Sequence, residues 1–185
     1  MGFLLSAVDL DPAALTDLVR DRSSGGFVSF EGWVRDHHEG RAVSSLSYEA
    51  YPVLAVKEGE RILAEALQRF PVRRAACVHR VGDLGIGGLA VWVGVSSDHR
   101  HEAFEACEWI IDQVKHRVPV WKKEFFADGS VEWVRCDRCA QGGGDASAHH
   151  DHGSHGSGHH HARHDHHDHH VTHLAAATTS PRVVA

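Results

Sequence analysis

Residues 89–124 read LAVWVGVSSDHRHEAFEACEWIIDQVKHRVPVWKKE, and their apolar pattern indicates the class of fold. The run Leu89–Ser96 has the length and β-branched composition of a buried strand. Asp98 is a helix-capping residue type, so we expect a helix from there to about Arg117, where a proline soon closes it. Val120–Phe126 then returns to a strand. A strand, a helix and a strand in succession predict a domain of mixed α and β structure.

The rest of the sequence before residue 135 extends this alternation. Strand and turn patterns predict the order β-α-β-β-α-β-β-α-β-β, an α+β domain with mixed or antiparallel pairing. The Gly85–Gly88 turn joins two strands, so it is not a dinucleotide-binding fingerprint. The further elements expected are strands over 3–9, 27–35, 43–51, 72–81 and 131–134, and helices over about 12–22 and from Pro52 to about Phe70.

Composition divides the 185 residues into a domain, 1–135, and a tail, 136–185. All 14 aromatic residues lie at or before Trp133, whereas 13 of the 19 histidines lie from His149 onward. The tail has too few apolar side chains for their burial to offset the conformational entropy that folding would cost. We therefore expect it to be disordered. The domain carries 16 basic and 20 acidic residues, which disfavours nucleic-acid binding, and no apolar run is long enough for a membrane span. Four cysteines without a secretory signal indicate the cytoplasm.

The tail contains one candidate metal motif. Cys136 and Cys139 form a single C-x-x-C, which is half of a zinc site, and His149 with His150 could complete it. The dense imidazoles could also hold Zn or Ni without fixed geometry. The alternative is a solvated tail that chelates weakly.

The helix expected before Arg117 places one lysine at the edge of its buried face. At 100° per residue from Phe104, the apolar stripe fills an arc of about 240° to 360° and Lys115 falls near 20°. A lysine in that position can serve as a base or nucleophile, or its stem can pack on the core while its ammonium reaches water. Trp109, near 140°, points away from the stripe and is a candidate contact at a subunit interface. The stripe consists of Cys107, Ile110, Ile111, Val114 and Val118.

The start of the same helix is a candidate anion site. Asp98, His99 and Arg100 combine free backbone N–H groups with an imidazole and a guanidinium, although a plain solvated cap would look the same. His99 and Lys115 are 16 residues apart, or about 24 Å along a helix. One small substrate therefore cannot touch both in one chain. Either these residues serve separate purposes, or a two-fold dimer brings His99 and Arg100 of one chain towards Lys115 of the other; we hypothesise the dimer.

Five blocks of residues together resemble the large, catalytic subunit of molybdopterin synthase, the MoaE family. The resemblance covers about residues 3–135. The blocks are Gly32-Trp33-Val34-Arg35, Leu46-Ser47-Tyr48-Glu49-Ala50-Tyr51, His79-Arg80-Val81-Gly82, Ser97-Asp98-His99-Arg100 and Lys115-His116-Arg117-Val118-Pro119-Val120-Trp121-Lys122-Lys123-Glu124.

The resemblance implies an α/β hammerhead fold, a homodimer within a heterotetramer, and an enzyme of molybdenum cofactor biosynthesis. Two sulfurs would pass from the thiocarboxylated C-terminus of a small ubiquitin-like subunit to cyclic pyranopterin monophosphate, forming the dithiolene of molybdopterin. No cofactor is required by this reaction. The implied catalytic residues are Lys115 and Lys122, and the implied substrate-binding segments contain these two with Trp33, Val34, Arg35, His99, Arg100, Lys123 and Glu124.

Two other functions compete with this one. The first is a Zn- or Ni-handling protein that uses the His-rich tail, but it leaves the five blocks unexplained. The second is a non-catalytic scaffold of the same fold. Retention of Lys115, Lys122, Arg35 and His99 argues against a scaffold, because partner contact alone does not need this set of cations.

Overall fold

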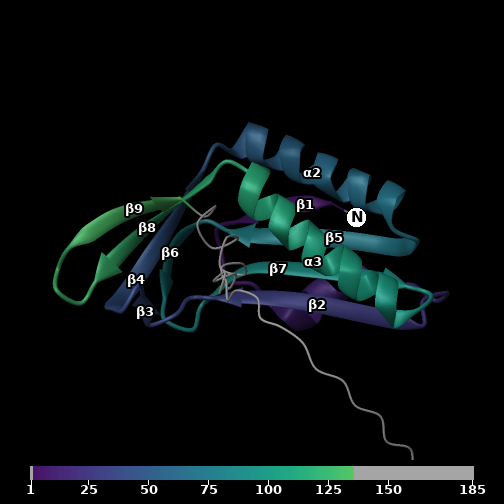
Figure 1. Cartoon of the computed structure of the whole chain (residues 1–185), viewed down its shortest axis with the longest axis horizontal. Helices are drawn as coiled ribbons and strands as arrows, with labels where there is room; N and C mark the ends of the chain where they lie inside the picture. The colour runs from purple at the N-terminus through teal and green to yellow at the C-terminus, as the bar shows by residue number, and fades with distance from the viewer. Residues whose placement is uncertain (1, 136–185) are drawn as a thin grey trace, which may run out of the picture. The chain divides into compact units, whose positions relative to one another are not determined.

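The structure, a computed structural model, describes residues 2–135 (Figure 1). The predicted metal-ligand pair, Cys136 and Cys139, and the whole His-rich segment lie outside the described residues. Within them the mixed α+β architecture predicted from the sequence is confirmed, with two sheets and three helices.

The first sheet has four strands in the order β1-β5-β7-β2. β1 (Phe3–Ser6) runs parallel to β5 (Val72–Arg80), and β7 (Leu89–Ser97) pairs antiparallel with β5 on one side and with β2 (Gly26–Trp33) on the other. β7 is buried from Ala90 to Ser97. It lacks polar alternation because both faces of this sheet are covered.

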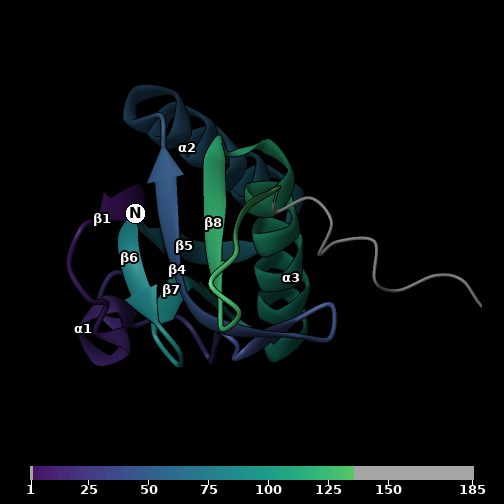
Figure 2. The ribbon, with the colours of Figure 1, turned by 90° about the vertical axis from the view of Figure 1, so that its left-hand side faces the viewer.

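The second sheet has five strands built around the antiparallel pair β4 (Arg41–Ala50) and β8 (Val120–Phe126). β9 (Val131–Arg135) pairs with β8, while the short strands β3 (His37–His38) and β6 (Gly82–Gly85) both pair with β4. Figure 2 shows β6, β4 and β8 side by side at one end of the molecule.

The helices cover the two faces of the first sheet unequally (Figure 1). α2 (Pro52–Arg69) packs on β1 and β5, and α3 (Arg100–Arg117) packs on β2 and β7. Their apolar faces and the sheet form the main core. The short α1 (Pro12–Thr16) lies on the opposite face, where a smaller cluster is centred on the fully buried Trp92.

The apolar stripe predicted for α3 is confirmed, since its five members are all less than 8% exposed. Phe104, from which the angles around the helix were counted, is however 60% exposed. Ala103 and Ala106 complete the buried face of α3. Trp109 is partly buried and packs within the chain, and its contact at a subunit interface stays a prediction. Its ring is half-buried between the helices, 5.9 Å from that of Phe70, so the packing of α3 on α2 uses it within the chain.

The predicted cap of α3 was wrong. The N-cap residue is His99, without a side-chain cap bond, and both carboxylate oxygens of Asp98 accept from Arg73 of β5, at 2.6 and 2.9 Å. A bidentate guanidinium pair holds that carboxylate away from the helix end. Sequence reasoning also extended α1 to about Arg22. The chain instead leaves the helix at Thr16, because the buried Val19 must reach Trp92.

Two short strands, β3 and β6, were not predicted from the sequence. A tight turn joins β3 to β4 through Glu39 and Gly40, which both have positive φ. β6 occupies the segment before the confirmed turn at Gly85–Gly88. Neither strand is long enough to show a period of two. No helix among residues 2–135 is long and apolar enough to cross a membrane.

Candidate active site

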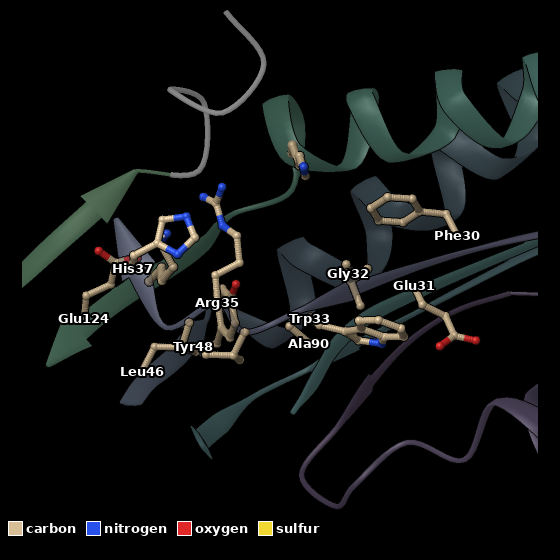
Figure 3. A pocket seen from close by; sticks show the side chains of 14 residues that line it. Phe30, Glu31, Gly32, Trp33, Arg35, His37, Leu46, Tyr48, Ala90 and Glu124 are labelled. Carbon is tan, nitrogen blue, oxygen red and sulfur yellow. The ribbon is translucent and has the colours of Figure 1, made fainter. Parts of the chain in front are cut away.

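A pocket of about 470 Å³ lies where the two sheets meet (Figure 3). Its walls come from the end of β2 and the following segment, from β4, from the start of β7, from the last turn of α3 and from β8. Six of the nine residues predicted to bind substrate line it: Trp33, Val34, Arg35, Lys115, Lys122 and Glu124.

Lys115 enters the pocket from the last turn of α3. It is half-buried, at the edge of the apolar stripe as predicted, and its Nζ lies 5.9 Å from the ring centroid of Phe30. No carboxylate among residues 2–135 forms an ion pair with it. Its amine is therefore available for chemistry in the pocket.

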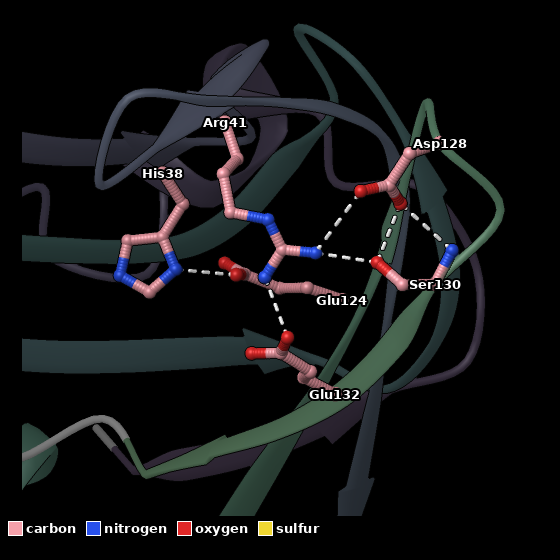
Figure 4. A network of polar contacts seen from close by, with 6 residues as sticks. All are labelled: His38, Arg41, Glu124, Asp128, Ser130 and Glu132. Atoms are coloured by element: carbon pink, nitrogen blue, oxygen red, sulfur yellow. Dashed lines mark hydrogen bonds and ion pairs between the residues drawn. The ribbon is translucent and has the colours of Figure 1, made fainter.

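Lys122 enters from β8 and is almost fully buried. Its Nζ donates to Oε1 of Glu124 at 2.6 Å. Oε2 of Glu124 accepts from Nδ1 of His38 at 2.5 Å, a contact shown in Figure 4. Burial alone raises the pKa of Glu124, but the hydrogen bonds and charges of Lys122 and His38 outweigh it and lower the pKa overall. The carboxylate is therefore ionised near neutral pH, and Lys122 faces the pocket as one half of a buried ion pair.

The segment from Trp33 to Arg35 is shaped by a β-bulge between Gly32 and Trp33. The backbone of buried Val34 then bonds to the Gly87–Gly88 turn, at 2.9 Å from its N–H and 2.8 Å to its carbonyl. Trp33 and Arg35 are exposed on either side of it. Arg35 has no carboxylate partner among the described residues, which leaves its guanidinium free to meet an anion at the pocket wall.

Three predicted residues are not brought to this pocket. His99 and Arg100 lie exposed at the first turn of α3, and Lys115 lies at the last turn of the same unbroken helix. Lys123 points to the other face of β8 from Lys122. Its Nζ lies 5.5 Å from the rings of both Phe125 and Trp133, where cation–π contact holds it.

Several lining residues were not among the predicted site residues, although some of them belong to the five blocks. Leu46 and Tyr48 share one face of β4, and the alternation of that strand could have shown it. Tyr48 also packs edge-on against buried His79, with 4.9 Å between ring centroids. Burial lowers the pKa of His79 to about 4, so this imidazole is neutral near pH 7. The other lining residues outside the predicted site are Phe30, Glu31, Gly32, His37, Ala90 and Val91.

The two described cysteines are core residues, and Cys107 was expected there as a member of the apolar stripe. Cys77 and Cys107 are free and buried. Burial raises the pKa of both thiols, that of Cys107 to about 11, so neither is a reactive thiolate. Residues 2–135 contain no group of three or more His, Cys, Asp or Glu side chains that could hold a metal ion.

Comparison with known proteins agrees with this arrangement. The sequence model of the MoaE protein family matches residues 5–117. The molybdopterin synthase catalytic subunit of Pyrococcus abyssi is 53% identical over 121 residues, which cover 65% of this chain and 81% of that protein. The protein of that name from Oryza sativa subsp. indica is 46% identical over 122 residues, 66% of this chain and 63% of the rice protein.

A solved structure shares the fold. The crystal structure of molybdopterin synthase from Staphylococcus aureus superposes with a TM-score of 0.66 at 32% sequence identity. The match covers 72% of this chain and 95% of that one. The chain described here therefore belongs to the MoaE family, whose members named above are molybdopterin synthase catalytic subunits.

Proposed function

We propose that this chain transfers sulfur to cyclic pyranopterin monophosphate and so forms the dithiolene of molybdopterin. The sulfur donor is the thiocarboxylated C-terminus of a small ubiquitin-like partner. The observation that carries the proposal is the meeting of Lys115 and Lys122 in one pocket with Arg35, in a chain of the MoaE family. Three cations converging on one cavity suit a substrate that carries a phosphate and a donor that carries a thiocarboxylate.

The two lysines have different surroundings and therefore different proposed roles. Lys122 is ion-paired with Glu124, and it neutralises charge on the thiocarboxylate or the phosphate. Lys115 has no carboxylate partner among residues 2–135. It therefore serves as general acid and base, or accepts the acyl group of the partner for part of the cycle.

No thiol of the described domain takes part in this chemistry. The buried Cys77 and Cys107 cannot act as nucleophiles, and they do not need to, because the sulfur arrives on the partner. Free thiols also fit the reducing cytoplasm as the proposed compartment.

His99 and Arg100 act, in this proposal, across a two-fold dimer. α3 is continuous from Arg100 to Arg117, so its first turn lies about 24 Å from Lys115. A second copy of the chain can place its own His99 and Arg100 near that pocket. The working assembly is then a homodimer with one small partner subunit at each pocket.

We further propose that residues 1–135 carry the whole catalytic activity. All described pocket residues fall in this range, and a C-x-x-C with a His-rich tail is not required by the reaction. A chain ending at residue 135 should keep its sulfur-transfer rate, and loss of that rate would contradict this division. Metal titration of the full and shortened chains would show whether Zn or Ni binding belongs to the tail.

The central experiment is a reconstituted sulfur-transfer assay. The purified chain is mixed with a thiocarboxylated small subunit and cyclic pyranopterin monophosphate, and dithiolene product is measured. Lys115→Ala should lower turnover by roughly 100-fold or more. Lys57→Ala is the matched control, because Lys57 is exposed on α2 and does not line the pocket. Unchanged turnover in Lys115→Ala would overturn the role of Lys115, and an inactive native dimer would overturn the proposed function.

A further inference from the structure

Three side chains from two strands form a continuous buried chain of polar contacts behind the pocket. It runs from Lys122 through Glu124 to His38, over contacts of 2.6 and 2.5 Å. Figure 4 shows the contact between Glu124 and His38. The three side chains are 9%, 4% and 14% exposed. His38 itself does not line the pocket, and it touches the pocket only through Glu124.

Strand pairing explains why these side chains meet. Lys122 and Glu124 are two residues apart on β8 and so share one face. Positive φ at Glu39 (48°) and Gly40 (78°) closes the tight turn that folds β3 back on β4. That hairpin brings His38 over β8, although 86 residues separate it from Glu124.

A second network anchors this hairpin. Arg41, the Cα partner of His38, donates to Glu132 at 2.5 Å and also to Ser130, and it forms an ion pair with Asp128 (Figure 4). Its guanidinium also stacks 3.6 Å from the ring centroid of Phe126. The backbone that carries His38 is therefore tied to the β8–β9 hairpin on which Lys122 and Glu124 depend.

The hydrogen bond from His38 has a defined direction. An ionised carboxylate only accepts, so Nδ1 of His38 carries the hydrogen in this contact. Each oxygen of Glu124 then has one donor, Lys122 on Oε1 and His38 on Oε2. A buried carboxylate that lost the second donor would turn or admit water to satisfy Oε2, because an unpaired buried acceptor is costly.

We infer that His38 is a positioning residue for sulfur transfer. Its Nδ1–H holds Glu124 so that Oε1 stays on the ammonium of Lys122, which keeps this cation fixed at the pocket wall. The inference rests on the proposed function, in which Lys122 neutralises charge during the reaction. His38 contributes no atom to the substrate and acts through Glu124 alone.

The first measurement reports on Lys122 without using activity. The full chain has four lysines, Lys57, Lys115, Lys122 and Lys123, so acetylation of each by acetic anhydride can be followed by peptide mass spectrometry. His38→Leu removes the donor and should speed acetylation of Lys122, relative to Lys57, by roughly fivefold or more. His38→Asn, whose amide can stand where Nδ1 stood, should restore most of the native protection.

The second measurement is steady-state sulfur transfer by the same variants. His38→Leu should lower kcat by roughly 10-fold or more while KM for the pterin changes little, because the misplaced cation is needed for the reaction step. His38→Asn should recover most of this loss. The matched control is Arg20→Leu, which removes an exposed donor that pairs with Asp17 and does not line the pocket. It should alter neither measurement.

The outcomes separate the inference from the function on which it rests. Native protection of Lys122 in folded His38→Leu would overturn the inference, and so would faster acetylation with unchanged kcat. A native chain that transfers no sulfur would overturn the proposed function and the role of His38 in the reaction. Faster acetylation of Lys122 in His38→Leu would still establish that His38 holds Glu124 in place. If His38→Leu does not fold, His38→Gln replaces it, because the amide of a glutamine reaches past the Nδ1 position. Equal Lys122 acetylation rates and equal kcat in His38→Gln and His38→Asn would then overturn the inference.

Discussion

Lys122 stands opposite Tyr48 in the antiparallel pairing of β8 with β4, and both side chains line the pocket. This register brings the lysine to the cavity wall, whereas its neighbour Lys123 points to the opposite face. A shift of one residue would exchange the two. The pairing of β4 with β8 therefore decides which of two adjacent lysines faces the pocket.

Arg35 should contribute substrate affinity. Its guanidinium lines the pocket and has no carboxylate partner among the described residues, so Arg35→Ala removes a cation free to hold an anionic substrate. Loss of a charge-assisted hydrogen bond corresponds to a rise in KM of roughly 10-fold or more. Steady-state kinetics with varied pterin concentration measure it. Arg22→Ala, an exposed arginine outside the pocket, is the control, and an unchanged KM in Arg35→Ala would remove Arg35 from the binding site.

Glu124 should make the stability of the domain depend on acid pH. Its folded pKa lies below the ordinary value of 4.5, so its contribution to the free energy of unfolding is fully present above that value and is lost as pH falls through the folded pKa. Urea unfolding between about pH 6 and pH 3 measures this. Glu124→Gln should lower stability near pH 7 by about 1–3 kcal/mol and flatten the acid dependence.

The control for Glu124 is Glu132→Gln, because Glu132 forms a half-exposed pair with Arg41 that is worth about 1 kcal/mol or less. Equal acid dependence in the native chain and in Glu124→Gln would show that the buried carboxylate is not the group that responds to pH.

Cys77 and Cys107 should resist alkylation in the folded protein. Burial raises the pKa of Cys107 from 9.0 to about 11, which by itself lowers its thiolate fraction about 100-fold, and the pKa of Cys77 rises further. Iodoacetamide treatment near pH 8, followed by peptide mapping, should leave both unmodified until denaturant is added. Rapid labelling of either cysteine in native protein would contradict its place in the core.

Gly59 should be intolerant of a side chain. A Cβ at this position of α2 would lie 2.0–2.5 Å from three ring atoms of Phe3, which is almost fully buried. Gly59→Ala should therefore destabilise the domain by about 2 kcal/mol or more, as seen in its thermal midpoint. Gly85→Ala meets no atom within 4 Å and should change the midpoint little. Equal midpoints for the two variants would mean that α2 packs differently on β1.

Local patterns in the sequence determined the elements and the buried stripe of α3. Stripe residues such as Ile110 and Val114 recur at helical spacing. An apolar run such as β7 can be recognised as a strand without knowing what it packs against. The same patterns failed at the start of α3, where Asp98 meets Arg73 of β5 instead of capping the helix. Helix capping is a local tendency, and a bidentate ion pair with a distant strand outweighed it.

The sequence by itself also indicated the candidate residues, through five blocks that resemble those of the MoaE family. Tertiary structure decided which of them meet: Lys115, Lys122 and Arg35 share one pocket, while His99 lies at the far end of α3. The physical reason is the difference between interactions that are local in the sequence and interactions that join distant segments. Periodicity encodes which face of an element is buried, but the pairing of His38 with Glu124, across 86 residues, follows from strand register and packing of the whole chain.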